Sequence, residues 1–101
     1  MKNIFLFCIL ILSVSCDKHK TQKQTVELSC GQCQFGLTSQ KGCDLAVRIH
    51  DKAYFVDGAH IDEFGDAHDE NSGFCEVIRK AEVEGELINN RFKVTTVKLL
   101  D

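Results

Sequence analysis

The chain has 101 residues, and its twelve Lys and Arg stand against fifteen Asp and Glu, a net charge of −3 at pH 7. This balance excludes nucleic acid as the expected partner, because neutralising a phosphate backbone requires a basic surface. The length allows one small domain, which buries only about 60% of its unfolded surface and often needs a disulfide or a metal for stability.

The N-terminal residues have the pattern of a secretory signal. Lys2 precedes an apolar run over 4–12, which is too short to span a bilayer as a helix. Cys16 follows the small-residue stretch 13–15 directly, an arrangement that resembles a bacterial lipobox with Ser in place of the usual Leu three positions before the cysteine. We therefore predict a signal peptide over 1–15 and lipidation of Cys16. The alternative is an ordinary cleaved signal beside an unrelated cysteine.

A lipid on Cys16 would hold the protein on a membrane without a transmembrane helix. The predicted location is the bacterial cell envelope, where the domain would face the periplasm or the cell surface. Residues 17–24 are polar throughout and show no periodicity, so the region 16–24 is predicted as the lipidated cysteine and a polar tether. The folded domain is then predicted over 25–101.

Alternating apolar residues and turn signals divide this domain into short elements. Five segments are predicted as strands: 25–30, 43–49, 53–57, 82–88 and 91–100. In the first of them, Cys30 shares the inward face with Val26 and Leu28. Asn89-Asn90 suits a two-residue hairpin turn, because asparagine tolerates left-handed backbone geometry.

The segment between the third and fourth strands predicts a loop and a helix. Residues 57–73 are rich in Asp and Glu and contain no Lys or Arg. Apolar residues over 74–81 recur at steps of three and four, which predicts a short amphipathic helix with Cys75 in its first turn. The order β-β-β-α-β-β is that of the OB-fold, so we predict a mainly β, five-stranded OB-like barrel with one short helix. The alternative is an irregular α+β domain.

Four motifs stand out in the mature segment: CGQCQFG at 30–36, GDAH at 65–68, GFC at 73–75 and the hairpin with Gly85. Together they resemble a family of small Cys-containing bacterial lipoproteins of uncharacterised function, some of which are labelled glutaminyl-tRNA synthetase. The resemblance implies the limits of the domain and no activity. The synthetase label does not fit an acidic chain of this length without a nucleotide-binding motif.

Cysteines are the main candidates for chemistry. Cys30 and Cys33 form a Cys-x-x-Cys pair, which is one half of a typical structural zinc site. Cys43 and Cys75 are single cysteines far apart in the chain, so the spacing alone leaves open whether they complete the site. Sulfur ligands favour zinc or copper(I) over calcium or magnesium.

Histidines near Cys75 are possible additional ligands. His60 and His68 could each replace one sulfur, and Asp66 is placed two residues from His68, where it could orient the imidazole. The acidic loop lacks the ligand register of an EF-hand, so calcium is not expected there.

Disulfides are the alternative to a metal. Four cysteines allow three pairings, and we favour Cys30 with Cys33 and Cys43 with Cys75. A redox role is a further alternative, because the Cys-x-x-Cys spacing is that of thioredoxin-like motifs. The residues after Cys33 predict no helix, however, and such motifs depend on one.

The sequence thus predicts a membrane-anchored exported lipoprotein with a small binding domain, whose four cysteines form a structural or metal-holding cluster. Binding is favoured over turnover, and no catalytic residue is assigned. The membrane is the predicted partner through the lipid anchor, nucleic acid is not a partner, and any protein partner is unknown. The competing hypotheses are a thiol-disulfide redox protein and an interaction module stapled by disulfides without metal.

Overall fold

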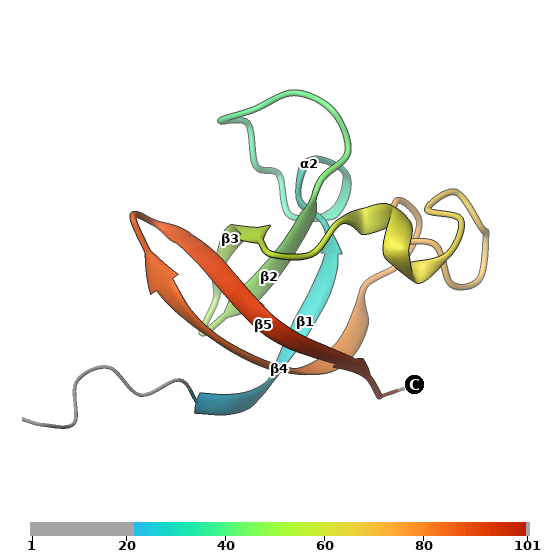
Figure 1. The fold of residues 1–101 in the computed structure, drawn as a ribbon. Coiled ribbons are helices and arrows are strands. Elements are labelled where there is room, and N and C mark those ends of the chain that lie inside the picture. Colours follow the sequence, from blue (N-terminus) through green and yellow to red (C-terminus); the bar gives the residue numbers. More distant parts are fainter. Residues whose placement is uncertain (1–21, 101) are drawn as a thin grey trace, which may run out of the picture.

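A computed structural model describes residues 22–100 as a small closed β-barrel (Figure 1). The predicted signal peptide and Cys16 lie outside these residues. The strands are β1 (Gln22–Cys30), β2 (Leu45–Ile49), β3 (Lys52–Asp57), β4 (Arg79–Ile88) and β5 (Arg91–Leu99). The helical elements are α2 (Gly31–Gln34) and the 3-10 helix η2 (Ile61–Phe64). Within this part of the chain, no helix is both long and apolar enough to cross a membrane.

Strand pairing closes the sheet in the order β1-β2-β3-β5-β4. β1 pairs antiparallel with β2 on one edge and with β4 on the other. The ring is completed by a short parallel contact between β3 and β5, at Val56 with Phe92 and Asp57 with Lys93. The predicted mainly β fold with a five-stranded barrel and one short helix is confirmed.

The position of the α-helix differs from the prediction. The helix expected over 74–81 is wrong, because turns occupy this region and β4 already begins at Arg79. The Phe74 carbonyl accepts from the backbone N–H of Cys30, and the Val77 carbonyl lies 2.7 Å from the Ser29 hydroxyl. These long-range bonds use carbonyl groups that would accept within a helix. The apolar periodicity instead reflects burial of Phe74 against the barrel.

The short helix lies at the Cys-x-x-Cys motif, where the sequence predicted none. α2 spans one turn after Cys30, and its first residue, Gly31, lies against Ala46 of β2 and Phe55 of β3. The predicted tether also ends earlier than expected, because β1 begins at Gln22 and residues 22–24 belong to the strand.

Two-residue turns join β2 to β3 and β4 to β5, and the second is the predicted Asn89-Asn90 turn. His50 and Asp51 connect β2 to β3 with φ of 50° and 71°, and Asn89 and Asn90 connect β4 to β5 with φ of 53° and 66°. Both pairs use the left-handed region, which favours Asn, Asp and His among non-glycine residues.

The core follows the alternation that the sequence predicted. Inward-facing residues of β1 form a row from Gln24 through Val26 and Leu28 to Cys30, and the last three are buried. Phe74 and Phe92 are the largest fully buried side chains. The row therefore runs through the barrel, with the Gln24 amide at one end and the Cys30 thiol at the other.

Gly85 marks a bend in β4, as the sequence predicted. The register between β4 and β5 shifts between Glu84 and Gly85. A Cβ at Gly85 would lie 2.8 Å from the Phe92 ring, so a side chain at this position would displace a core aromatic.

Gly31 allows α2 to approach the sheet, and we predict that Gly31→Ala destabilises the domain. Its Cβ would lie 2.7 Å from Phe55 Cε1 and 3.0 Å from Leu37 Cδ1. Overpacking of this kind costs about 1–3 kcal/mol, measurable as a lower midpoint in urea unfolding. Phe55→Leu should relieve part of the clash, so the two substitutions should be coupled in a double-mutant cycle.

Gly36→Ala is the matched control for this cycle. Gly36 has a φ of 70°, and a Cβ there would have no atom within 4 Å. Its cost should come from the backbone alone and should be independent of Phe55→Leu. Equal coupling of both glycine variants to Phe55→Leu would contradict the steric explanation.

Candidate functional site: a four-cysteine cluster

Three separate segments bring the four cysteines to one end of the barrel. Cys30 ends β1, Cys33 lies within α2, Cys43 precedes β2 and Cys75 precedes β4. Their four Sγ atoms all lie within 4.8 Å of one another. The cysteines that the sequence leaves far apart therefore form one compact group.

Cys43 is at the centre of this group. Its Sγ lies 2.6 Å from that of Cys75, 2.9 Å from that of Cys30 and 3.9 Å from that of Cys33. The cysteines are free thiols in this structure. The sulfurs thus converge on one point and do not separate into two isolated pairs.

The burial of the four cysteines decreases from the barrel core toward the solvent. Cys30 is completely buried, as its place in the inward row of β1 predicted, while Cys43 and Cys75 are half-buried and Cys33 is exposed. One side of the group therefore rests on the barrel core, and the other opens to water.

Cys30 connects the barrel to α2. It is the N-cap of the helix, and the backbone N–H of Cys33 donates to its Sγ at 3.3 Å. The Phe35 and Leu37 N–H groups then both donate to the Gly31 carbonyl. This single turn is what directs both sulfurs of the Cys-x-x-Cys motif to the same side.

The Cys75 segment is held to β1 by buried hydrogen bonds. The hydroxyl of Ser29, which is fully buried, lies 2.7 Å from the carbonyl oxygens of both Phe74 and Val77. The Cys30 N–H donates to the Phe74 carbonyl at 3.2 Å. The Gln34 side chain adds a bond of 2.8 Å to the Cys75 carbonyl. Cys75 is therefore fixed relative to both Cys30 and Cys33.

The Cys43 segment is held by Gln32, the residue between the paired cysteines. The Gln32 side chain donates to the Asp44 carboxylate at 2.8 Å and accepts from the Asp44 backbone N–H at 2.9 Å. Gln40 donates to the same carboxylate at 2.8 Å and accepts from Arg91 at 3.1 Å. Hydrogen bonds from Gln40 and Gln32 hold the pKa of Asp44 below its usual range.

The chain belongs to DUF6370, a family of unknown function. The family model matches residues 24–100, which covers the barrel except for the first two residues of β1 and includes all four clustered cysteines. No curated protein and no solved structure matches the chain. The DUF6370 family carries no assigned activity, so the chemistry of this domain must be argued from the cluster itself.

The thiols of the cluster differ in their pKa. Burial acts to raise the pKa of Cys30, but hydrogen bonds from Cys43 and Cys33 outweigh it and leave this pKa below its ordinary value. Hydrogen bonding to Cys30, together with burial, raises the pKa of Cys33 to about 12. Burial and the hydrogen bond to Cys30 raise the pKa of Cys43. Hydrogen bonds from its neighbours thus favour ionisation of Cys30 over that of Cys33 and Cys43, and metal binding would displace the protons of these thiols.

The candidate histidine ligands lie outside the cluster. His60 caps η2, where its Nδ1 accepts from the Asp62 N–H at 3.2 Å. His68 Nδ1 lies 3.9 Å from Asp66 Oδ1, so this predicted pair is adjacent, but both side chains are exposed. Among residues 22–100, the group that can hold a metal contains the four cysteines only.

Sequence reasoning missed the residues that support the cluster. Gln32, Asp44 and Ser29 carry no motif of their own, and each acts through a partner that is distant in the chain. The one local signal was the alternation of β1, which places Ser29 on the face opposite to Leu28 and Cys30. A buried serine on that face indicates that another segment covers it.

Gln32→Ala should loosen the Cys43 segment. It removes both side-chain bonds to Asp44, and a hydrogen bond to a charged group contributes about 1.5–3 kcal/mol. Because these groups are only partly buried, we expect a loss of roughly 1–2 kcal/mol in the free energy of unfolding of the reduced, metal-free protein. Urea unfolding measures this difference.

Gln24→Ala is the matched control, since the Gln24 side chain lies on β1 and makes no hydrogen bond within the described residues. It should change the unfolding midpoint little. A Gln32→Ala variant as stable as Gln24→Ala would show that Asp44 is not held through Gln32.

Proposed function

We propose that this domain is a metal-binding module in which Cys30, Cys33, Cys43 and Cys75 hold one zinc or copper(I) ion. The observation that carries the proposal is the convergence of four sulfurs within 4.8 Å. A zinc–sulfur bond is about 2.3 Å long, so sulfurs at this separation can reach a single ion. Four soft ligands without an oxygen ligand favour zinc or copper(I) over harder cations.

The contact pattern favours a metal over two disulfides. A pair of disulfides requires each sulfur to have one close partner, whereas Cys43 has short sulfur contacts with Cys30, Cys33 and Cys75. The nearest pair, Cys43 with Cys75, supports a disulfide-stapled module as the second candidate. In that case the barrel would be an interaction module whose staple joins the loop before β2 to the turn before β4.

Four protein ligands would leave no coordination position open for a substrate, which is typical of structural metal sites. The bound ion would join the end of β1, the loop before β2 and the turn before β4. These segments are far apart in the chain, so joining them restricts the unfolded state strongly. The proposed role is therefore stabilisation of a binding domain, and turnover is not part of it.

The proposed location is the bacterial cell envelope, with the domain lipidated at Cys16 and facing the periplasm or the outside. Support comes from the apolar run over 4–12 and the cysteine that follows it. β1 begins at Gln22, so only five residues separate Cys16 from the barrel. A tether this short keeps the barrel close to the membrane surface.

Metal analysis of the reduced mature protein tests the metal proposal. We expect about one equivalent of zinc or copper(I) per chain, and Cys75→Ser should weaken its retention against a chelator by at least about tenfold, because one of the four ligands is lost. Cys16→Ser is the matched control and should retain the ion. In protein isolated without reductant, loss of four hydrogen atoms by mass with no bound metal would contradict the proposal and leave the disulfide-stapled module.

Labelling of expressing cells with palmitate tests the anchor. The full chain should incorporate the label and sediment with membranes, and Cys16→Ser should abolish both properties. Cys75→Ser should remain labelled, because its cysteine lies in the folded domain. A wild-type chain that is processed but unlabelled would show that the protein is secreted without a lipid.

A further inference from the structure

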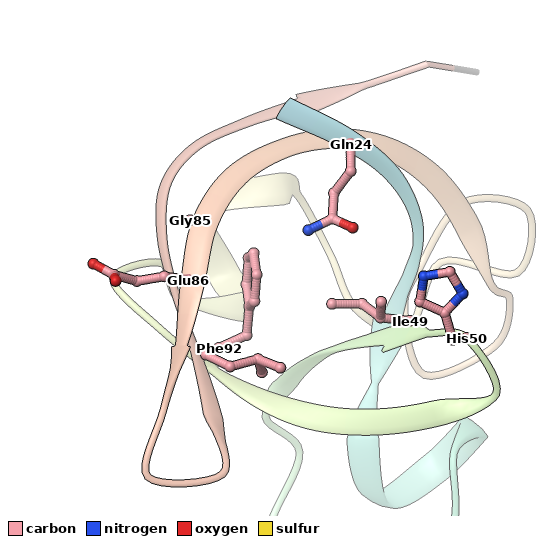
Figure 2. A pocket seen from close by; sticks show the side chains of 7 residues that line it. Gln24, Ile49, His50, Gly85, Glu86 and Phe92 are labelled. Carbon is pink, nitrogen blue, oxygen red and sulfur yellow. The ribbon is translucent and has the colours of Figure 1, made fainter. Parts of the chain in front are cut away.

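The end of the barrel opposite the cysteines contains a pocket of about 260 Å³ (Figure 2). It is lined by β1, β2, the β2–β3 turn, β4 and β5, through residues that include Gln24, Ile49, His50, Gly85, Leu87 and Phe92. The inward row of β1 ends here at Gln24 and at the other end at Cys30. The metal proposal makes no use of this pocket.

The larger part of its wall is apolar. The Phe92 ring and the Ile49 side chain face the hollow in Figure 2. Leu87 is also a lining residue. Leu87 is 50% exposed, although its neighbour in the pairing, Phe92, is buried. Gly85 keeps the wall of β4 free of a side chain at the bend.

Three polar residues line the pocket, Gln24, His50 and Glu86, and the Glu86 carboxylate points away from the hollow in Figure 2. The Gln24 amide points toward the hollow and the His50 imidazole lies at its edge (Figure 2). Within residues 22–100, neither side chain forms a hydrogen bond. Gln24 is half-buried on the inward face of β1, so its amide is accessible to a ligand in the pocket. Apolar walls with a few free polar groups are the usual composition of a ligand site.

The volume limits the ligand. An engineered cavity of about 150 Å³ holds one benzene molecule, and pockets for drug-sized ligands begin near 300 Å³. A pocket of 260 Å³ therefore suits one short apolar chain and excludes a complete lipid with several chains.

We propose that this pocket binds the end of an acyl chain next to its carbonyl group, and that its occupant is a chain of the lipid on Cys16. The inference rests on the proposed lipidation. The aliphatic and aromatic walls would cover the chain, and the Gln24 amide and the His50 ring could donate to the carbonyl oxygen. β1 begins at Gln22, six residue steps after Cys16, so a covalent reach of up to about 20–22 Å allows the lipid to return to this end of the barrel.

Titration with N-octanoylglycine tests the site directly. The probe carries one short acyl chain and one amide carbonyl, and the protein is the mature chain with Cys16→Ser, which lacks the lipid. Backbone amide NMR signals of residues at the pocket, such as Gly85 and His50, should shift, while those of Cys33 and Cys75 should not. An absence of shifts at the pocket up to millimolar probe would overturn the site.

Leu87→Ala should weaken probe binding by about fivefold or more, because it removes apolar contact area at the rim. Leu100→Ala is the matched control, since Leu100 is 49% exposed and does not line the pocket. Gln24→Ala should also weaken binding, whereas its unfolding midpoint should stay near that of the wild type. Equal affinities for Leu87→Ala and Leu100→Ala would overturn the proposed position of the chain.

The lipidated chain identifies the occupant. A chain that carries a dipalmitoyl cysteine at position 16, from cells or installed by peptide ligation, should no longer bind the probe. Probe binding that is equal with and without this lipid would overturn the anchor as the occupant. If cells fail to attach palmitate but the ligated lipid blocks the probe, the acyl-binding site is supported and the proposed lipid anchoring in the cell envelope is contradicted.

Discussion

The buried contact between β1 and the turn that carries Cys75 is the constraint on which the site depends. Ser29 is fully buried and its hydroxyl is satisfied by two carbonyl oxygens of the 74–77 region. The next residue, Cys30, uses its N–H for one of the same carbonyls. These bonds bring Cys75 to the end of a strand that lies far from it in the chain. Without them, the cluster would consist of Cys30, Cys33 and Cys43 alone.

The strand β1 has two functions because its residues alternate. Its inward face contributes Gln24, Val26, Leu28 and Cys30 to the barrel interior, and Ser29 points outward under the Cys75 turn. Both neighbours of β1 in the sheet are fixed by long antiparallel registers. A shift of one residue would exchange these faces and separate the sulfurs, so the same register sets the core and the cluster.

The sequence predicted the features of the fold that depend on neighbouring residues, and it failed for those that depend on contacts distant in the chain. The strands, both two-residue turns and the inward position of Cys30 follow from alternation and turn chemistry, which act over a few residues. The prediction of a helix over 74–81 was wrong because Phe74 is buried by packing against the barrel and not by a helix face. Its carbonyl accepts hydrogen bonds from residues of β1. α2 was missed because one turn has too few residues for a periodic pattern, and a cysteine sulfur caps it.

The same argument applies to the site. Cys-x-x-Cys indicated two sulfurs of one group, but the spacing could not bring in Cys43 and Cys75, since loop paths across a barrel have no signature in sequence. Gln32 appeared to be a spacer between two cysteines. In the structure it binds both the carboxylate and the backbone of Asp44 and thereby positions Cys43. Residues that act through a distant partner become visible only when the fold supplies that partner.

The graded burial of the cluster suits the electrostatics of the proposed metal site. Four thiolates around a divalent ion would carry a net charge of −2, and a charge of this size is costly to bury without partners. Cys30 would be the buried ligand, and its sulfur accepts from the N–H of Cys33. Cys33 itself remains in contact with water, which can solvate the remaining charge. A cluster at the rim of a barrel can therefore hold a charged metal–thiolate group that the apolar centre, lined by Val26 and Leu28, could not.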